Sequence, residues 1–303
     1  MSPLTPGIPM SSRVEPVTEA LLREWGLPDP GDSKKSRGDV MVVGGSRSSP
    51  GAVLLAGESA LRVGAGRVAL AVPQSIDAQV GIALPEAGIL ALPDDADAPL
   101  KGHLREKVSA ADAVLVGPGF SDPDETRATL LAVAATGPRV VVLDAFALGV
   151  LPAVDRGDLP DDIILSPNKD EARILLGREL ADDVADVCEI ARRFDAVVNC
   201  YGVVAQADGC AWRVDDGDSG LGTSGSGDVL AGATAGFAAR GVAPARAAVW
   251  GSWTHARAGA RLRERIGLRY LARDLAPPLP PAVHRVDDLQ VRLEDDGEER
   301  LVH

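Results

Sequence analysis

The chain is short of aromatic residues, cysteines and long apolar runs, and each shortage excludes a class of protein. Aromatic residues make up 3% of its 303 positions, which disfavours an aromatic-rich β-sandwich and favours close packing of helices on a sheet. Its three cysteines lack CxxC spacing and its four histidines lack metal-ligand spacing, so we expect neither a disulfide framework nor a zinc site. Glu58, Arg62 and Arg67 interrupt the best candidate for a membrane span.

Basic residues are also in the minority. The formal net charge is -13 and the pI is about 4.8, which argues against nucleic acid or an anionic membrane surface as a partner. The N-terminus shows no basic segment followed by an apolar one, as a secretory signal would. We therefore expect a soluble, cytoplasmic protein with small-molecule partners, no nucleic acid and no membrane.

Short apolar strands alternate with helices along the chain. Strands are expected at 40–45, 67–73, 87–92, 113–119, 139–145, 162–168 and 196–202, followed by a hairpin at 203–214. Helices are expected at 18–25, 52–66, 125–136, 171–177, 183–194, 228–241 and 245–262. This alternation predicts an α/β fold, a three-layer α/β/α sandwich with a mainly parallel central sheet.

Changes in composition divide the chain into three parts. Residues 1–38 carry scattered Pro, Ser and charge, and are predicted to form an N-terminal arm with a short helix. No break divides residues 39–276, which we expect to form a single catalytic domain. Residues 277–303 are acidic and Pro-rich, and are interpreted as a C-terminal tail with room for one short strand.

Ligands of such folds collect at the carboxyl ends of the strands. Glycines gather there at 44–45 and 117–119, beside Asp144 and the segment 166–168, although tight turns after strands also favour glycine. Two phosphate-binding loops are excluded. No lysine follows a glycine, as a Walker A loop requires, and the turn after the first strand of the sheet lacks GxGxxG.

The stretch GLGTSGSGDVLAGATAG at 220–236 offers another anion site. Gly225, Ser226 and Gly227 lead into a helix that starts near Asp228, and their backbone N–H groups and the helix dipole favour a bound anion. The Asp228 carboxylate is then placed to accept a proton from a substrate hydroxyl. The other interpretation is that Asp228 only caps the helix, although Ser224 and Ser226 also offer caps.

Five segments carry a family resemblance. GSGDVLAG at 225–232 resembles the signature of the ribokinase-like superfamily, in which the loop forms an anion hole and its Asp is the catalytic base. Within that superfamily the chain most resembles the ADP- or ATP-dependent NAD(P)H-hydrate dehydratases. The supporting segments follow the family order at 40–73, 111–120, 141–148, 165–177 and 225–241.

The resemblance implies a ribokinase-like fold, a homotetramer, and a reaction. With Mg²⁺ and ADP or ATP as phosphoryl donor, the family phosphorylates the hydroxyl of hydrated NADH or NADPH (NADHX, NADPHX), and phosphate then leaves. By position, Asp228 is the base and Gly225, Ser226 and Gly227 form the anion hole. The hydrated cofactor then contacts Ala52, Gly119, Asn168 and Asp228. The adenine nucleotide contacts Asn199, Cys200, Tyr201, Gly202, Val203 and Gly227.

The chain departs from the family pattern at three positions. Asn168 replaces a His, and with Glu171 it forms the N-x-x-E pattern of the wider superfamily, in which the Glu organises Mg²⁺ through water. Locally, Asn168 and Glu171 are equally explained by the end of a strand and the start of a helix. Asn199 replaces a phosphate-reaching Lys, for which Arg47 or Lys169 are candidate substitutes, and Phe146 replaces an Asp.

Three functions remain open on these residues. The segment GGSRSSPGAV at 44–53 favours the dehydratase. The combination of N-x-x-E with GSGD also suits a small-molecule kinase of the same superfamily, acting on a vitamin precursor or a sugar. A nucleotide-binding protein with little catalysis is the third, and the replacements at 199 and 146 favour it.

Overall fold

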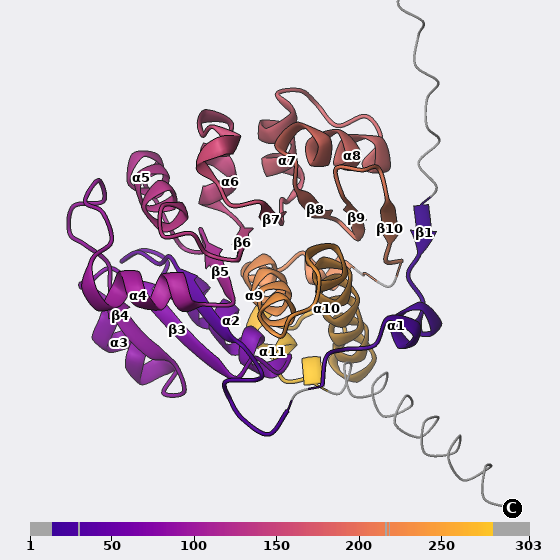
Figure 1. Cartoon of the computed structure of the whole chain (residues 1–303). Helices are drawn as coiled ribbons and strands as arrows, with labels where there is room; N and C mark the ends of the chain where they lie inside the picture. The colour runs from indigo at the N-terminus through magenta and orange to yellow at the C-terminus, as the bar shows by residue number, and fades with distance from the viewer. Residues whose placement is uncertain (1–13, 30, 216, 218, 281–303) are drawn as a thin grey trace, which may run out of the picture.

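A single twisted sheet forms the centre of the molecule (Figure 1). The computed structural model describes residues 14–29, 31–215, 217 and 219–280. Its ten strands lie in the order β1-β10-β9-β8-β7-β6-β5-β2-β3-β4. Their bounds are β1 Val14–Pro16, β2 Asp39–Val43, β3 Arg67–Val72, β4 Gly88–Ala91, β5 Ala113–Val116, β6 Val140–Leu143, β7 Asp162–Leu165, β8 Val197–Cys200, β9 Val203–Ala205 and β10 Ala211–Arg213.

Most of this sheet is parallel and buried on both sides. Only β9 runs against its neighbours, pairing antiparallel with β8 and with β10. Every residue of β5 and β6 is buried, which explains why these segments are uninterrupted apolar runs. Along β2 the side chains alternate, so that Val40 and Val42 enter one hydrophobic core and Met41 and Val43 enter the other. The sheet therefore separates two cores.

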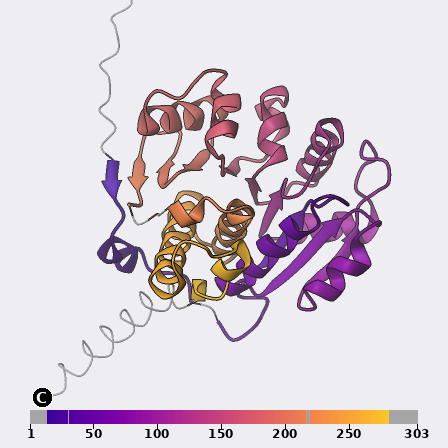
Figure 2. The ribbon, with the colours of Figure 1, turned by 180° about the vertical axis from the view of Figure 1, so that it is seen from behind.

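Helices cover each face of the sheet, and the predicted three-layer sandwich is confirmed (Figures 1 and 2). One core takes side chains from α1 Glu19–Trp25, α2 Gly51–Arg62, α3 Asp77–Ala83, α9 Ser226–Ala239, α10 Pro244–Ile266 and α11 Ala272–Leu275. The other takes side chains from α4 Gly102–Ala110, α5 Pro123–Ala134, α6 Phe146–Val150, α7 Lys169–Leu176 and α8 Asp183–Phe194. Within the described residues, no helix combines the length and apolarity needed to cross a bilayer.

Both ends of the described chain attach to this sandwich. In the segment predicted as an arm, β1 pairs in parallel with β10, and Leu22 of the predicted short helix is fully buried. The Trp25 ring meets the Trp212 ring edge to face, with their centroids 5.9 Å apart. At the other end Leu279 is fully buried. Residues 277–280 form no strand, and the rest of the predicted tail, 281–303, lies outside the described residues.

The predicted strands and helices are all present, with shorter strands than expected. The glycines at 44–45 and 117–119 lie beyond the strand ends, in loops at the carboxyl edge. The sequence prediction missed β1, α3, α4, α6 and α11. The helix α4 buries only Val108, so its apolar signal is weak, and the other four elements have seven residues or fewer.

Candidate active site

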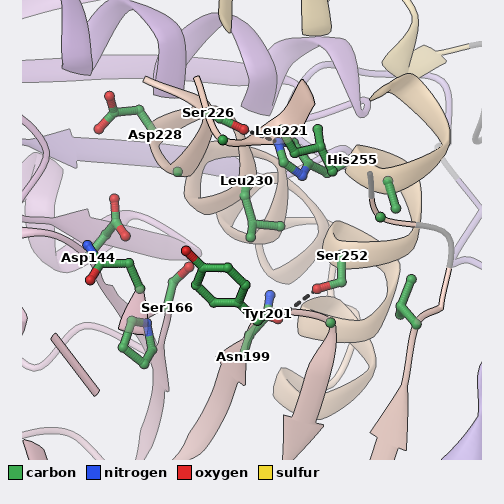
Figure 3. A pocket seen from close by; sticks show the side chains of 18 of the residues that line it. Asp144, Ser166, Asn199, Tyr201, Leu221, Ser226, Asp228, Leu230, Ser252 and His255 are labelled. Carbon is green, nitrogen blue, oxygen red and sulfur yellow. Dashed lines mark hydrogen bonds between the residues drawn. The ribbon is translucent and has the colours of Figure 1, made fainter. Parts of the chain in front are cut away.

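A cavity of about 610 Å³ opens at the carboxyl edge of β6, β7 and β8. Its volume lies in the range of small-molecule sites, roughly 300–1,000 Å³. Side chains reach it from the ends of these strands, from Val214, Asp215, Ser219 and Leu221 before α9, and from α7, α9 and α10 (Figure 3). The expectation that ligand groups gather at the carboxyl ends of parallel strands therefore corresponds to a real cavity.

The first turn of α9 forms one end of the cavity. Gly225 is the N-cap, with φ of 88°, and a Cβ atom added there would lie 2.6 Å from Leu55 Cδ1. No side chain caps this helix. Ser226 donates its N–H to Thr223 O at 3.2 Å, while the N–H groups of Gly227 and Asp228 belong to the first turn and have no acceptor within the helix. With Gly227 exposed, these donors suit an anion.

Asp228 is the third residue of α9, and the interpretation that it caps the helix is wrong. Its carboxyl group lines the cavity and is partly buried. Burial raises the pKa of Asp228 to about 6, because the charged form loses hydration. A carboxylate with this pKa is largely ionised at neutral pH and is a stronger base than an ordinary one. These are the properties of a general base.

Three further carboxyl groups make the cavity acidic. Asp144 follows β6 and is 4% exposed; burial raises its pKa well above the ordinary value, and the charges of Asp228 and Glu171 raise it further. Burial also raises the pKa of Glu171, against the opposing effect of its hydrogen bond with the Asn168 backbone. Asp215 is exposed at the rim. Among the described lining residues there is no Lys or Arg, so a bound polyphosphate needs a cation from elsewhere.

Asn168 and Glu171 form a capping box at the start of α7. Asn168 Oδ1 accepts from the N–H groups of Asp170 at 2.8 Å and Glu171 at 2.9 Å, and Glu171 Oε2 accepts from the Asn168 N–H at 2.8 Å. The local interpretation of this pair is therefore confirmed. Both residues also line the cavity, so the cap fixes two polar side chains at its wall.

The turn between β8 and β9 forms the other end of the cavity. Tyr201 and Gly202 both have positive φ, 48° and 78°, as a two-residue hairpin turn requires. The Tyr201 ring is 65% exposed, and Lys169 Nζ lies 4.8 Å from its centroid. Just before the turn, Asn199 is 2% exposed and accepts a 2.7 Å hydrogen bond from Ser252 Oγ. Its Nδ2 atom is buried and has no partner.

The cavity brings together most of the predicted site residues. Those that line it are Asn168, Glu171, Asn199, Tyr201, Gly202, Gly225, Ser226, Gly227 and Asp228. Ala52 and Gly119 do not line it, but they adjoin each other, since a Cβ atom added at Gly119 would lie 3.1 Å from Ala52 Cβ. Ala52 lies one turn before Leu55 on α2, and Leu55 contacts Gly225. This pair therefore lies next to the α9 end, outside the cavity wall.

Three other residues singled out from the sequence point elsewhere. The side chains of Cys200 and Val203 are buried in the core, and burial raises the pKa of the Cys200 thiol to about 12. Phe146 is 39% exposed at the start of α6 and is outside the cavity lining. Any contact that Cys200 or Val203 makes with a ligand must therefore come from the backbone.

The set of predicted site residues omitted Asp144, Ser252 and His255. Asp144 carries a signal, because it directly follows an apolar strand. The other two lie in the middle of a long helix, and His255 had counted only as one of four scattered histidines. Its Nε2 atom lies 3.0 Å from Ser226 Oγ, a contact between residues 29 positions apart. No local pattern predicts such a contact.

The sheet and its covering helices form a ribokinase-like fold. The structure resembles a ribokinase-like superfamily protein of Enterococcus faecalis, with a TM-score of 0.77 and 20% identity over 93% of this chain and 99% of that one. It also resembles the ADP/ATP-dependent NAD(P)H-hydrate dehydratase of Bacillus subtilis co-crystallised with ATP/Mg²⁺. There the TM-score is 0.79 and the identity 26%, over 90% of this chain and 99% of that one.

The sequence comparisons place the chain more narrowly. A family model described as NAD(P)H-hydrate dehydratase matches residues 40–281. The ADP-dependent (S)-NAD(P)H-hydrate dehydratase of Xanthomonas campestris is 41% identical over 285 residues, which cover 90% of this chain and 98% of that protein. The chain belongs to the NAD(P)H-hydrate dehydratase family. It spans 50% of a longer relative, the bifunctional NAD(P)H-hydrate repair enzyme Nnr of Moorella thermoacetica, at 35% identity.

Proposed function

We propose that the protein is an ADP- or ATP-dependent dehydratase that repairs hydrated NADH and NADPH. The observation that carries the proposal is the position of Asp228, a carboxylate with a pKa of about 6, beside the open first turn of α9 in a ligand-sized cavity. The family membership supplies the substrate class, and the relative in Xanthomonas campestris supplies the name of the reaction.

The first step of the proposed reaction is a phosphoryl transfer. The Asp228 carboxylate accepts the proton of the substrate hydroxyl, and the oxygen forms a bond to the terminal phosphorus of the nucleotide. The bond from that phosphorus to the bridging oxygen breaks, and AMP leaves from ADP, or ADP from ATP. The N–H groups of Gly227 and Asp228 and the dipole of α9 stabilise the charge on the transferred group.

The second step is the loss of phosphate from the substrate. The nitrogen of the reduced nicotinamide ring donates its electron pair, the carbon–oxygen bond breaks, and inorganic phosphate carries the electrons away. The departing phosphate or a water molecule then takes a proton from the neighbouring ring carbon, which restores the double bond of NADH or NADPH. Because the substrate itself drives this step, the protein needs no second base for it.

The two substrates are assigned to the two ends of the cavity. The adenine nucleotide lies at the β8–β9 turn against Asn199, Tyr201 and Gly202, with the backbone of Cys200 and Val203 behind them. It reaches toward Gly227. The hydrated cofactor is assigned to the α9 start and the neighbouring pair Ala52 and Gly119, and to Asn168 in the cavity wall.

Mg²⁺ fits the donor set of the cavity as a phosphate-bound ion. Mg²⁺ takes oxygen ligands, keeps several waters, and is usually held by one or two carboxylates together with phosphates. No group of three acidic, His or Cys side chains in the described residues is arranged to hold a metal directly. Glu171 and Asp144 would hold such an ion through water, and it would supply charge neutralisation for the polyphosphate.

One observation favours the alternative of a small-molecule kinase. Asn168 and Glu171 supply the N-x-x-E pattern at the cavity wall, and phosphoryl transfer needs nothing beyond Asp228 and the α9 start. The products separate the two functions. A kinase leaves a stable phosphate ester, whereas the dehydratase releases inorganic phosphate and restores the absorbance of reduced nicotinamide.

The test is one assay with hydrated NADH or NADPH, Mg²⁺, and ADP or ATP, followed at the reduced-nicotinamide band. We expect recovery of absorbance and one phosphate released for each turnover. Nucleotide binding without recovery or ester formation favours the third function, a binding protein with little catalysis. The homotetramer and the cytoplasmic location stay predictions.

A further inference from the structure

Two polar side chains of α10, Ser252 and His255, lie one helical turn apart and line the same cavity. Each is buried and forms a hydrogen bond to a residue of another element. His255 bonds Ser226 of α9, and Ser252 bonds Asn199 of β8 (Figure 3). The two partners belong to opposite ends of the cavity, the anion site and the β8–β9 turn. One face of α10 therefore touches both ends of the site.

The His255 contact fixes the start of α9. A hydrogen bond of 3.0 Å joins His255 Nε2 and Ser226 Oγ, and both side chains are buried, at 7% and 4% exposure. Burial lowers the pKa of His255 to about 4, against the effect of a hydrogen bond with the Ser226 backbone, so the ring is neutral at physiological pH. Ser226 precedes the two residues whose free N–H groups form the anion site, so its placement sets theirs.

The Ser252 contact fixes the orientation of an amide. Ser252 Oγ donates to Asn199 Oδ1 at 2.7 Å, which leaves Asn199 Nδ2 on the other side of the carboxamide. That nitrogen is buried without a partner in a residue that lines the cavity. A buried donor without a partner costs stability unless a ligand or water accepts from it. Because Asn199 lines the cavity, a bound ligand can supply that acceptor once a small turn of the amide opens a path to the nitrogen.

We propose that Ser252 and His255 are positioning residues for the reaction, each acting on one end of the cavity. His255 holds the α9 anion site in place through Ser226. Ser252 turns the Asn199 amide so that its NH₂ group donates to an oxygen or nitrogen acceptor of the adenine nucleotide. The inference rests on the proposed function, and it assigns different kinetic effects to two neighbours on one helix.

The Ser252 half predicts an effect on nucleotide binding. With Ser252→Ala the amide loses its anchor, and we expect the KM for the nucleotide to rise about tenfold, the equivalent of one hydrogen bond, with kcat within about twofold. Ser252→Thr keeps the hydroxyl and should restore most of the affinity. Calorimetric titration with ADP and Mg²⁺ measures the same loss without turnover.

The His255 half predicts an effect on turnover. His255→Leu keeps the volume but removes the bond to Ser226, and we expect kcat to fall about tenfold while the nucleotide KM changes by less than about threefold. His255→Gln retains a hydrogen-bonding group near the Nε2 position and should recover part of kcat. Equal loss in the Leu and Gln variants overturns this half.

Thr254→Val provides a matched control on the same helix. Thr254 is fully buried and its hydroxyl bonds the Trp250 carbonyl of α10, away from the cavity lining. We expect this variant to keep both kcat and KM. If it reproduces the losses of Ser252→Ala or His255→Leu, those losses are general effects of disturbing α10, and the proposal is wrong.

A double variant, Asn199→Leu with Ser252→Ala, separates binding from structure. Removing both polar partners takes away the buried unpaired donor, so we expect the melting temperature to stay level or rise while ADP affinity falls at least tenfold. A lower melting temperature with unchanged affinity shows that the amide is structural and overturns the proposal. Wild-type protein without ADP binding or turnover contradicts the proposed function instead, which keeps the two failures distinct.

Discussion

The two ends of the cavity are built in different ways. At the α9 end the functional groups are backbone N–H groups and one carboxylate, held by a left-handed glycine that leaves no room for a side chain. At the β8–β9 end they are side chains, namely a neutral amide and an exposed tyrosine with a lysine over its ring. The first end fits the family resemblance, whereas the second departs from it at Asn199.

The α9 end depends on one backbone conformation, whereas the side chains at the β8–β9 end can be replaced by others that supply the same interaction. Backbone donors require one particular chain conformation, so the α9 end tolerates few sequences. Side chains at the other end only need to supply a donor or a surface, which a lysine, an amide or a ring achieves by different routes. The predictions below test whether damage to the first end affects turnover and damage to the second affects binding.

The largest effect is expected from Asp228→Asn. The amide cannot accept the substrate proton, so kcat should fall by about 10³-fold, within the range for loss of a general base, while ADP binding stays within about twofold. Steady-state kinetics and calorimetric titration measure the two quantities. Wild-type turnover in this variant contradicts the assignment of the base.

Gly225→Ala is expected to have the next largest effect. The added Cβ atom meets Leu55 at 2.6 Å and the φ of 88° is unfavourable for alanine, so the first turn of α9 must shift. We expect kcat to fall by about 10²-fold, the order of losing an oxyanion donor. Gly137→Ala is the control, because Gly137 has φ of 70° in open space away from the cavity. A similar fall in kcat in that control would attribute the effect to backbone strain alone.

Acid should lower kcat/KM by protonating Asp228 at the α9 end. With the pKa of Asp228 at about 6, log(kcat/KM) should rise with a slope near one below pH 6 and level off above it. The raised pKa of Asp228 affects stability in the opposite direction, because the folded state loses stability as the pH rises. Because the folded-state pKa is raised, the contribution of this group to stability is full below pH 4 and is lost as the pH rises through 6.

A comparison of melting temperatures tests that sign. At pH 7, Asp228→Asn should be more stable than the wild type by on the order of 1–2 kcal/mol, and the gap should close near pH 4. The other raised carboxyl groups, Asp144 and Glu171, stay in both proteins. Because the Asp228 charge raises the pKa of each, its removal also relieves repulsion and acts in the same direction at neutral pH. A gap that widens on acidification contradicts the raised pKa of Asp228.

The smallest effect is expected from Lys169→Met. Lys169 lies over the Tyr201 ring at the rim, where exposed charge contributes modestly. We expect the nucleotide KM to rise about threefold with kcat unchanged, and the difference from wild type to shrink in high salt. Lys101→Met, which removes an exposed lysine outside the cavity lining, is the control for a general change in net charge.

The sequence predicted the sheet and the α9 end well because both depend on local patterns. Apolar runs followed by glycine mark buried strands, and Gly225 and Gly227 before a run of small and apolar residues mark the start of α9. The side-chain caps that the sequence offered there are absent from the structure. Whether Asp228 caps the helix could be decided only from the structure, because it depends on the residue at which α9 begins.

The rest of the site depends on contacts between distant residues. Ser252 reaches Asn199 across 53 positions, and Ala52 at the start of α2 meets Gly119 in the loop after β5. Short motifs carry no information on such pairs. The capping box at Asn168 shows the converse, because its local role was predictable, while its place in the cavity wall follows only from the arrangement of β7 beside β8.

The pairing of β1 with β10 bears on how the sheet is closed. Residues 14–16 pair with residues 211–213, which lie almost two hundred positions later in the chain. Without β1 this side of β10 would be an open strand edge, which is a template for wrong association. Trp212 Nε1 donates to Glu15 Oε2 at 3.0 Å across this junction. The β1 segment thus covers the edge of β10, and the sheet is complete only when segments almost two hundred positions apart have met.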